Sequence, residues 1–147
     1  MPNFQGSGFT IELPDDCIDA SSYAFVLPEC EGFSANLTVR FEPAIDVSDL
    51  QAHVNISIES LKSNVVDFVL INQVAGKRGP HNGVMSNYEW GASESRVRVK
   101  QYCIMTAGDV PRIYTLTAVD LASNADQSAT VFNRMMKNFI PNQEQLF

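Results

Sequence analysis

The sequence predicts an α+β fold, in which a curved antiparallel sheet of about six to seven strands has two main helices packed on it. Short segments with apolar residues at alternate positions recur between turn residues, as expected for strands. Two longer segments instead repeat apolar residues at three- and four-residue spacing, as expected for helices. A length of 147 residues suits one domain, so residues 1–147 are expected to form a single unit with its own core.

Three strands are predicted in the first part of the chain. In residues 8–13, three apolar side chains alternate with polar ones until Pro14 ends the strand. Residues 23–27 form a short apolar strand that ends at Pro28. Residues 35–42 place apolar side chains on one face and polar side chains on the other.

The first helix is predicted to begin at Ser48, where the period changes. Ser48 and Gln51 fit a capping box, in which the hydroxyl and the side-chain amide satisfy each other's free backbone amides. Residues 54–58 alone would also fit a strand, but the cap favours a helix. Its apolar stripe is Leu50, Val54, Ile58, Leu61 and Val65.

Four more strands and a second helix complete the predicted fold. The strands span residues 68–75, 84–90, 96–106 and 112–119. Short turns join them, so successive strands are expected to be antiparallel neighbours. The second helix begins near Ser123 or Asn124 and ends before Pro141. Its buried stripe is Ala125, Ala129, Phe132, Met136 and Phe139.

Several of these strands carry apolar side chains on both faces, whereas a sheet with one wet face should alternate. The larger, aromatic row, which includes Tyr23 and Phe25, is assigned to the core under the two helices. The other row, which includes Ala24 and Val26, then forms a mixed apolar patch, and such patches usually mark interaction sites. The alternative is a three-layer sandwich with one helix on each face and nothing exposed. The sequence leaves both arrangements open.

Catalytic signals are missing from the sequence. His53 and His81 have no second His or Cys at metal-ligand spacing, and no nucleophile elbow or phosphate-binding loop occurs. The carboxylate pair at Asp15 and Asp16 flanks a turn, and Asp46 and Asp49 precede a helix. We therefore expect no enzyme, no catalytic residue, no cofactor and no metal.

Charge and cysteine content indicate the compartment and exclude some partners. A net charge of -7 disfavours both nucleic acids and anionic membrane surfaces. The sequence shows no secretory signal and no apolar run long enough to span a membrane. Three cysteines without a CxxC spacing suit a reducing compartment. A soluble, cytoplasmic protein is expected.

The order of several short motifs resembles DcrB-related domains over nearly the whole chain. Residues 8–14 and then 23–27 are similar to the opening of that family, and later motifs follow in the same order. These are Asn36-Leu-Thr-Val-Arg40, Val99-Lys-Gln101, Thr115-Leu-Thr-Ala118 and the closing helix from Phe132 to Phe139. The chain departs from the family at Cys17, where Trp is usual, and at Ser22, which is often apolar.

The resemblance implies a fold shared with PsbP-like and Mog-type proteins. It also implies a function, since stand-alone members resemble the Eag chaperones of bacterial type VI secretion. In that group a homodimer cradles the hydrophobic N-terminal transmembrane helices of a toxin effector until the effector is loaded onto the secretion spike. The expected partners are therefore an effector and a second copy, with the spike protein reached through the effector and no direct membrane insertion.

The partner-binding residues come from two sources. The resemblance assigns Gln101 through the Val-x-Gln motif, and Ala24 and Val26 through the short apolar strand. Assignment of the second row adds four residues: Phe68, Cys103, Met105 and Ile113. Two rival functions remain open, an interaction module that docks on a folded soluble protein and a carrier of a small ligand.

Overall fold

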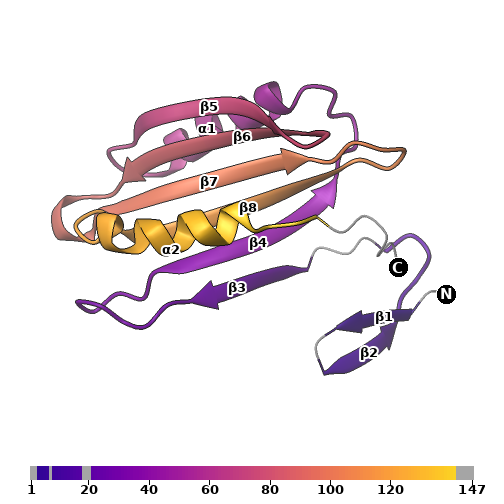
Figure 1. Ribbon diagram of the computed structural model, residues 1–147, viewed down its shortest axis with the longest axis horizontal. Coiled ribbons are helices and arrows are strands. Elements are labelled where there is room, and N and C mark those ends of the chain that lie inside the picture. The colour runs from indigo at the N-terminus through magenta and orange to yellow at the C-terminus, as the bar shows by residue number, and fades with distance from the viewer. Residues whose placement is uncertain (1–2, 7, 18–20, 142–147) are drawn as a thin grey trace.

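A computed structural model describes residues 3–6, 8–17 and 21–141 of the chain. Within these residues, six strands form one antiparallel sheet in the spatial order β3-β4-β8-β7-β6-β5 (Figure 1). The strands are β3 (Ser22–Val26), β4 (Asn36–Pro43), β5 (Val69–Arg78), β6 (His81–Trp90), β7 (Val97–Met105) and β8 (Arg112–Leu121). The predicted α+β fold with an antiparallel sheet is confirmed.

The second half of the sheet is a meander and the first half is joined to it by a long-range pairing. Strands β5 to β8 follow one another along the chain and pair with their neighbours, as predicted from the short turns between them. Strand β4 instead pairs with β8, and Thr38 lies opposite Thr117. This pairing leaves β3 and β5 as the two edge strands.

The first predicted strand is present but belongs to a separate hairpin. Strand β1 (Asn3–Gly6) pairs with β2 (Phe9–Glu12) in a two-stranded sheet that lies apart from the main one (Figure 1). Phe9 and Ile11 are 56% and 49% exposed. The alternation in residues 8–13 therefore predicted a strand correctly, but these side chains are not buried as expected.

Helix α1 (Leu50–Asn64) buries the predicted stripe through Leu50, Val54 and Ile58. Its cap is one residue later than predicted. The Asp49 carboxylate accepts hydrogen bonds from the backbone amides of Gln51 and Ala52, so Asp49 is the N-cap and the predicted capping box at Ser48 is wrong. A carboxylate there also complements the positive end of the helix dipole.

Helix α2 (Ala125–Lys137) begins directly after Asn124, as predicted. Its buried positions include Phe132 and Met136, while Arg134 and Lys137 stand in its last turn, where basic side chains complement the helix dipole. The short 3-10 helix η1 (Ser93–Ser95) occupies the turn between β6 and β7.

The two helices pack on opposite faces of the sheet (Figure 1). Helix α1 packs with β6, β7 and Ile113 of β8 in one core cluster. Helix α2 packs on the other face, where Tyr114 and Leu116 belong to the aromatic row. The expectation that both helices cover the aromatic row is therefore wrong, and Tyr23 and Phe25 of that row are each 51% exposed. The alternative is correct in placing one helix on each face, but not in leaving nothing exposed.

Candidate functional site

One helix is too narrow to cover a six-stranded face. Strands lie about 4.8 Å apart, so six of them span roughly 24 Å, whereas a helix with its side chains is about 10–12 Å wide. Helix α1 contacts β6 and β7 and packs with Ile113 at the start of β8, so on this face β3, β4 and the middle of β8 have no helix over them (Figure 1). We call this part the uncovered face. Its residues are Ala24 and Val26 of β3, Asn36, Thr38 and Arg40 of β4, and Thr117 of β8, and Gln101 of β7 lies at its border.

A row of small and polar side chains crosses the sheet on this side. Side chains of directly opposed residues in neighbouring antiparallel strands point to the same face. The registers place six residues in this row: Gln73, Ser86, Gln101, Thr117, Thr38 and Ala24. The row begins beside α1 and continues onto the uncovered face.

Hydrogen bonds fix the half of the row that lies beside α1. The Gln51 amide of α1 donates to Gln73 Oε1 at 2.7 Å, and the Gln73 amide donates to Ser86 Oγ at 3.0 Å. Further along the row, Gln101 and Thr117 are half-buried, so their polar groups lie at the boundary between the core and solvent.

All seven predicted partner-binding residues lie on the α1 side of the sheet. The second row of the sequence pattern is therefore a real face of the molecule. Only part of it is accessible, however. Ala24 is exposed and Val26 is 65% exposed on the edge strand β3, and Gln101 is half-buried on β7, three strands away in the same row as Ala24.

The other four predicted residues pack in the core under α1. Ile113 is 1% exposed and Cys103 is 6% exposed. Phe68 lies against the Tyr88 ring at 5.4 Å between centroids, and Met105 packs against the same cluster. In a folded subunit, Cys103 and Ile113 therefore stabilise the core and do not present a surface to a partner.

Burial also suppresses acid–base chemistry beside this face. It raises the pKa of Tyr88 to about 12, against the opposing effect of the Arg40 charge. Burial likewise raises the pKa of the Cys103 thiol, although a hydrogen bond with Thr115 acts in the other direction. Both groups are neutral near pH 7, so the arrangement is suited to binding through apolar contacts and hydrogen bonds.

Four polar residues of the uncovered face were not predicted as site residues. Asn36, Thr38 and Arg40 were assigned to the polar side of their strand, and Thr117 to the second row without a role. The alternation in residues 35–42 could have pointed to these β4 residues, because it predicts a polar strand face. Their place on the uncovered face, however, follows only from the pairing of β4 with β8. A hollow of about 240 Å³ lies at the Arg40 end, lined by Arg40, Phe41, Glu42, Ile113 and Thr115.

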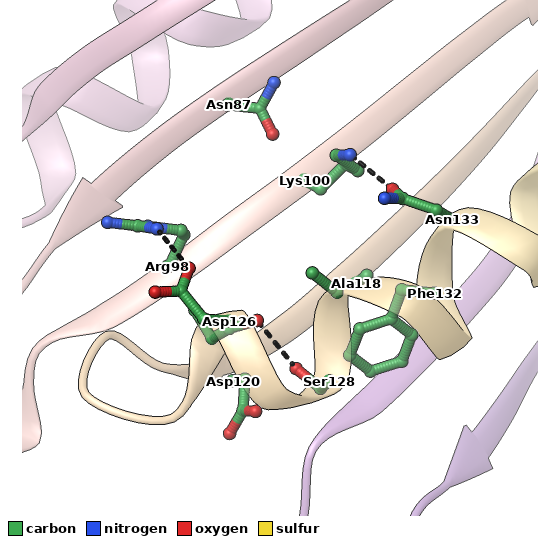
Figure 2. Close-up of a pocket in the computed structure, with 11 residues that line it drawn as sticks. Asn87, Arg98, Lys100, Ala118, Asp120, Asp126, Ser128, Phe132 and Asn133 are labelled. Atoms are coloured by element: carbon green, nitrogen blue, oxygen red, sulfur yellow. Dashed lines mark hydrogen bonds and ion pairs between the residues drawn. The ribbon is translucent and has the colours of Figure 1, made fainter.

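A second hollow, of about 160 Å³, lies on the opposite side, between α2 and the sheet. We call it the Phe132 hollow. Figure 2 shows Arg98 pointing toward Asp126 at the first turn of α2 and Lys100 reaching Asn133 further along the helix. Arg98 lies 3.7 Å from Asp126, and the Lys100 amino group donates to Asn133 Oδ1. Charged and amide groups thus surround this hollow.

Glu89 holds two arginines at the end of β6 that adjoins this hollow. Its carboxylate is 2.9 Å from Arg96 and 2.5 Å from Arg98, and its side chain is 16% exposed. Partial burial raises the pKa of Glu89, but the hydrogen bonds and charges of Arg96 and Arg98 outweigh it, so the pKa is lowered overall.

This ion-pair cluster predicts a loss of stability in acid. Because the folded pKa of Glu89 lies below its ordinary value of about 4.3, its contribution is present above that value and is lost as the pH falls through the folded pKa. Glu89→Gln should lower the unfolding free energy by about 1–3 kcal/mol at pH 7 and by less in acid. Urea unfolding measured from pH 7 to pH values below about 4 tests this. The control is Glu94→Gln at an exposed position, and an equal loss at both pH extremes would contradict the prediction.

Comparison with known proteins supports the fold and leaves the family open. No protein-family model and no curated protein matches the chain, so membership of the DcrB-related family stays a prediction. The solved structure of PA94 from Pseudomonas aeruginosa, a protein of unknown function, aligns with a TM-score of 0.79 at 17% identity. The alignment covers 97% of each chain.

Two further structures share the fold at lower similarity. CyanoP, the PsbP of Synechocystis sp. PCC 6803, aligns with a TM-score of 0.54 at 11% identity over 93% of this chain and 100% of its own. LpqN of Mycobacterium tuberculosis aligns with a TM-score of 0.56 at 12% identity over 81% of this chain and 82% of its own. These likenesses show the fold alone, and the predicted PsbP-like fold is confirmed. None of the described helices is long and apolar enough to cross a membrane.

Proposed function

We propose that this protein is an adaptor chaperone that shields the apolar, membrane-spanning N-terminal segments of a type VI secretion toxin effector. The observation that supports this most directly is the uncovered face, where exposed Ala24 and Val26 adjoin β4 and the row continues from Thr38 through Thr117 to Gln101, all three half-buried and polar. Such a surface offers apolar contact and hydrogen bonds at the same place.

The dimensions of the uncovered face fit a guest helix. Three strands with a spacing of about 4.8 Å present a strip close to the 10–12 Å width of a helix. A guest helix would lie beside α1 and complete the helical layer on that face. Val26 and Ala24 would contact its apolar side chains.

The polar row would recognise the small polar residues by which membrane helices associate. Transmembrane helices pack through Gly, Ala, Ser and Thr, and their hydroxyl groups hydrogen-bond across the interface. The Gln101 amide and the hydroxyls of Thr38 and Thr117 can both donate and accept such bonds. We further propose that a second copy of the chain completes the cradle, and that the effector links the chaperone to the secretion spike.

The second candidate is an interaction module that docks on a folded soluble protein. It is favoured by charged residues at the margin of the same face, where Arg40 is exposed and Glu42 lies 3.6 Å from His53 of α1. Binding by such charges should weaken strongly with salt, whereas apolar binding of a membrane helix should not. A saturable small molecule that raises the melting temperature would instead support a carrier.

Co-expression with a guest tests the chaperone function. The guest is an effector N-terminal fragment with apolar stretches of about 20 residues, fused to a soluble tag. We expect the fusion to stay in the supernatant after ultracentrifugation only when this protein is present, and to co-elute with it in moderate and high salt. A matched guest with an aspartate at the centre of each apolar stretch is the control. If the fragment sediments regardless, or both guests co-elute equally, the proposal fails.

A further inference from the structure

Basic side chains gather at the C-terminal end of α2, on the face opposite the uncovered face. A hollow of about 300 Å³ there lies between the helix and the β5–β6 hairpin. We call it the cationic hollow. It is lined by Lys77, Arg78, Met85, Tyr102, Asn133, Met136 and Lys137. Three of these seven residues are cations, and none is a carboxylate.

Contacts within the hollow hold one of its cations, Arg78, in place. The Arg78 guanidinium donates to the backbone carbonyls of Met136 and Lys137 in the last turn of α2. It also lies 5.9 Å from the centroid of the Tyr102 ring, within cation–π range. Arg78 therefore bridges β5 and α2, and its charge is fixed above an apolar floor of Tyr102, Met85 and Met136.

The cationic hollow adjoins the Phe132 hollow, since Asn133 lines both. Arg98 and Lys100 line the Phe132 hollow, but so do Asp120 and Asp126, so the excess of positive charge lies in the cationic hollow. We call the two adjoining hollows together the groove. Among the described residues, no carboxylate lies within ion-pair distance of Lys77, Arg78, Lys100 or Lys137. Although the chain has a net charge of -7, the cationic hollow thus carries positive charge that no described carboxylate pairs with.

We propose that this groove binds a short, acidic, extended peptide segment of a partner protein, with carboxylates at the cations and an apolar side chain on the floor of the cationic hollow. Helix α2 has 13 residues and is therefore about 20 Å long, which matches about six residues of extended chain. The apolar floor of Tyr102, Met85 and Met136 favours a peptide over a bare phosphate, because an apolar side chain can pack on it.

This site is independent of the proposed chaperone function. The groove lies on the α2 side of the sheet, whereas a membrane-helix guest would bind on the α1 side. Both segments could therefore be bound at once, for example by two parts of one effector or by two different proteins.

Fluorescence anisotropy with a labelled peptide, Glu-Asp-Leu-Phe-Asp-Glu, tests the proposal on the full chain. We expect saturable binding that weakens as salt is raised, and little binding of the amide control Gln-Asn-Leu-Phe-Asn-Gln. The double variant Lys77→Glu, Lys137→Glu should weaken binding at least about tenfold, because two attractive charges become repulsive. Both side chains are exposed, so the fold should tolerate the change.

A matched pair of single variants tests whether a basic residue must lie at the cationic hollow to affect peptide binding. Lys137→Glu and Lys62→Glu each remove an exposed basic residue from the last turn of a helix, but Lys62 belongs to α1 on the other face. Lys137→Glu should weaken peptide binding and Lys62→Glu should leave it within about twofold. Absence of saturable binding, equal affinity for the amide peptide, or full affinity in the double variant would each overturn the proposal. Tighter binding of duplex RNA or phosphatidylserine vesicles than of the acidic peptide would overturn it as well.

Discussion

Val26→Glu is expected to abolish binding of an apolar guest helix while leaving the fold intact. Val26 is 65% exposed on the edge strand β3, where a charged residue is tolerated and even discourages aggregation. Under a bound guest, however, the carboxylate would lose its water, which costs several kcal/mol for an unpaired charge. Affinity for the guest should therefore fall by more than about a hundredfold.

The measurement is the fraction of guest fusion kept in solution, together with the guest affinity and the melting temperature of each variant. Val131→Glu is the matched control, since Val131 is 42% exposed on α2, on the opposite face. Gln101→Lys should act like Val26→Glu, because it places a charge in the polar row. Normal guest binding by Val26→Glu, or an equal loss in Val131→Glu, would show that the uncovered face is not the guest site.

Local elements were predictable because their signals lie close together in the sequence. The stripe at Leu50, Val54 and Ile58 needs only the helical period. The apolar stripe of α2 likewise placed its start near Ser123 or Asn124, although the Asn124 side chain makes no cap hydrogen bond. The shift of the first cap from Ser48 to Asp49 reflects two adjacent residues that can both cap a helix. Ser and Asp are about equally preferred as N-cap residues, so the residue types alone did not decide between them.

Placement of the helices could not be predicted in the same way. Each helix has one apolar stripe, and each face of the sheet offers an apolar row. The periodicity is therefore compatible with either helix on either face. The pairing of β4 with β8 brings together segments about 80 residues apart, and no local signal encodes it. The uncovered face depends on that pairing, since Thr38 meets Thr117 only across it.

The sequence therefore predicted which residues share a face of the sheet, but not which of them a partner can reach. Ala24, Val26 and Gln101 lie where a partner can reach them, and Cys103 and Ile113 share their face but lie under α1. Alternation tells which side of a strand a residue faces. It does not tell which part of that side a helix will cover.

Ile113→Ala is expected to lower the free energy of unfolding by about 2–5 kcal/mol, with a fall in melting temperature of roughly 10 °C. Ile113 is 1% exposed and packs in the cluster under α1, so truncation leaves a cavity that the sheet cannot close. Thermal and urea unfolding of the variant measure the effect. Thr117→Ala, on the same strand and face but only half-buried, is the control and should cost less than about 1 kcal/mol.

This result separates the two arrangements that the sequence left open. If both helices packed on the aromatic row, Ile113 would lie on a solvated face and its truncation would be nearly neutral, while Leu116→Ala would remain costly. With one helix on each face, Leu116 at 1% exposure and Ile113 at 1% exposure belong to different clusters, so both truncations should be costly. Their effects should also add, because the two side chains point to opposite sides of the sheet and share no packing partner. If Ile113→Ala lowers the free energy of unfolding only slightly, α1 does not cover this face. The proposed guest helix would then have no helix to lie beside.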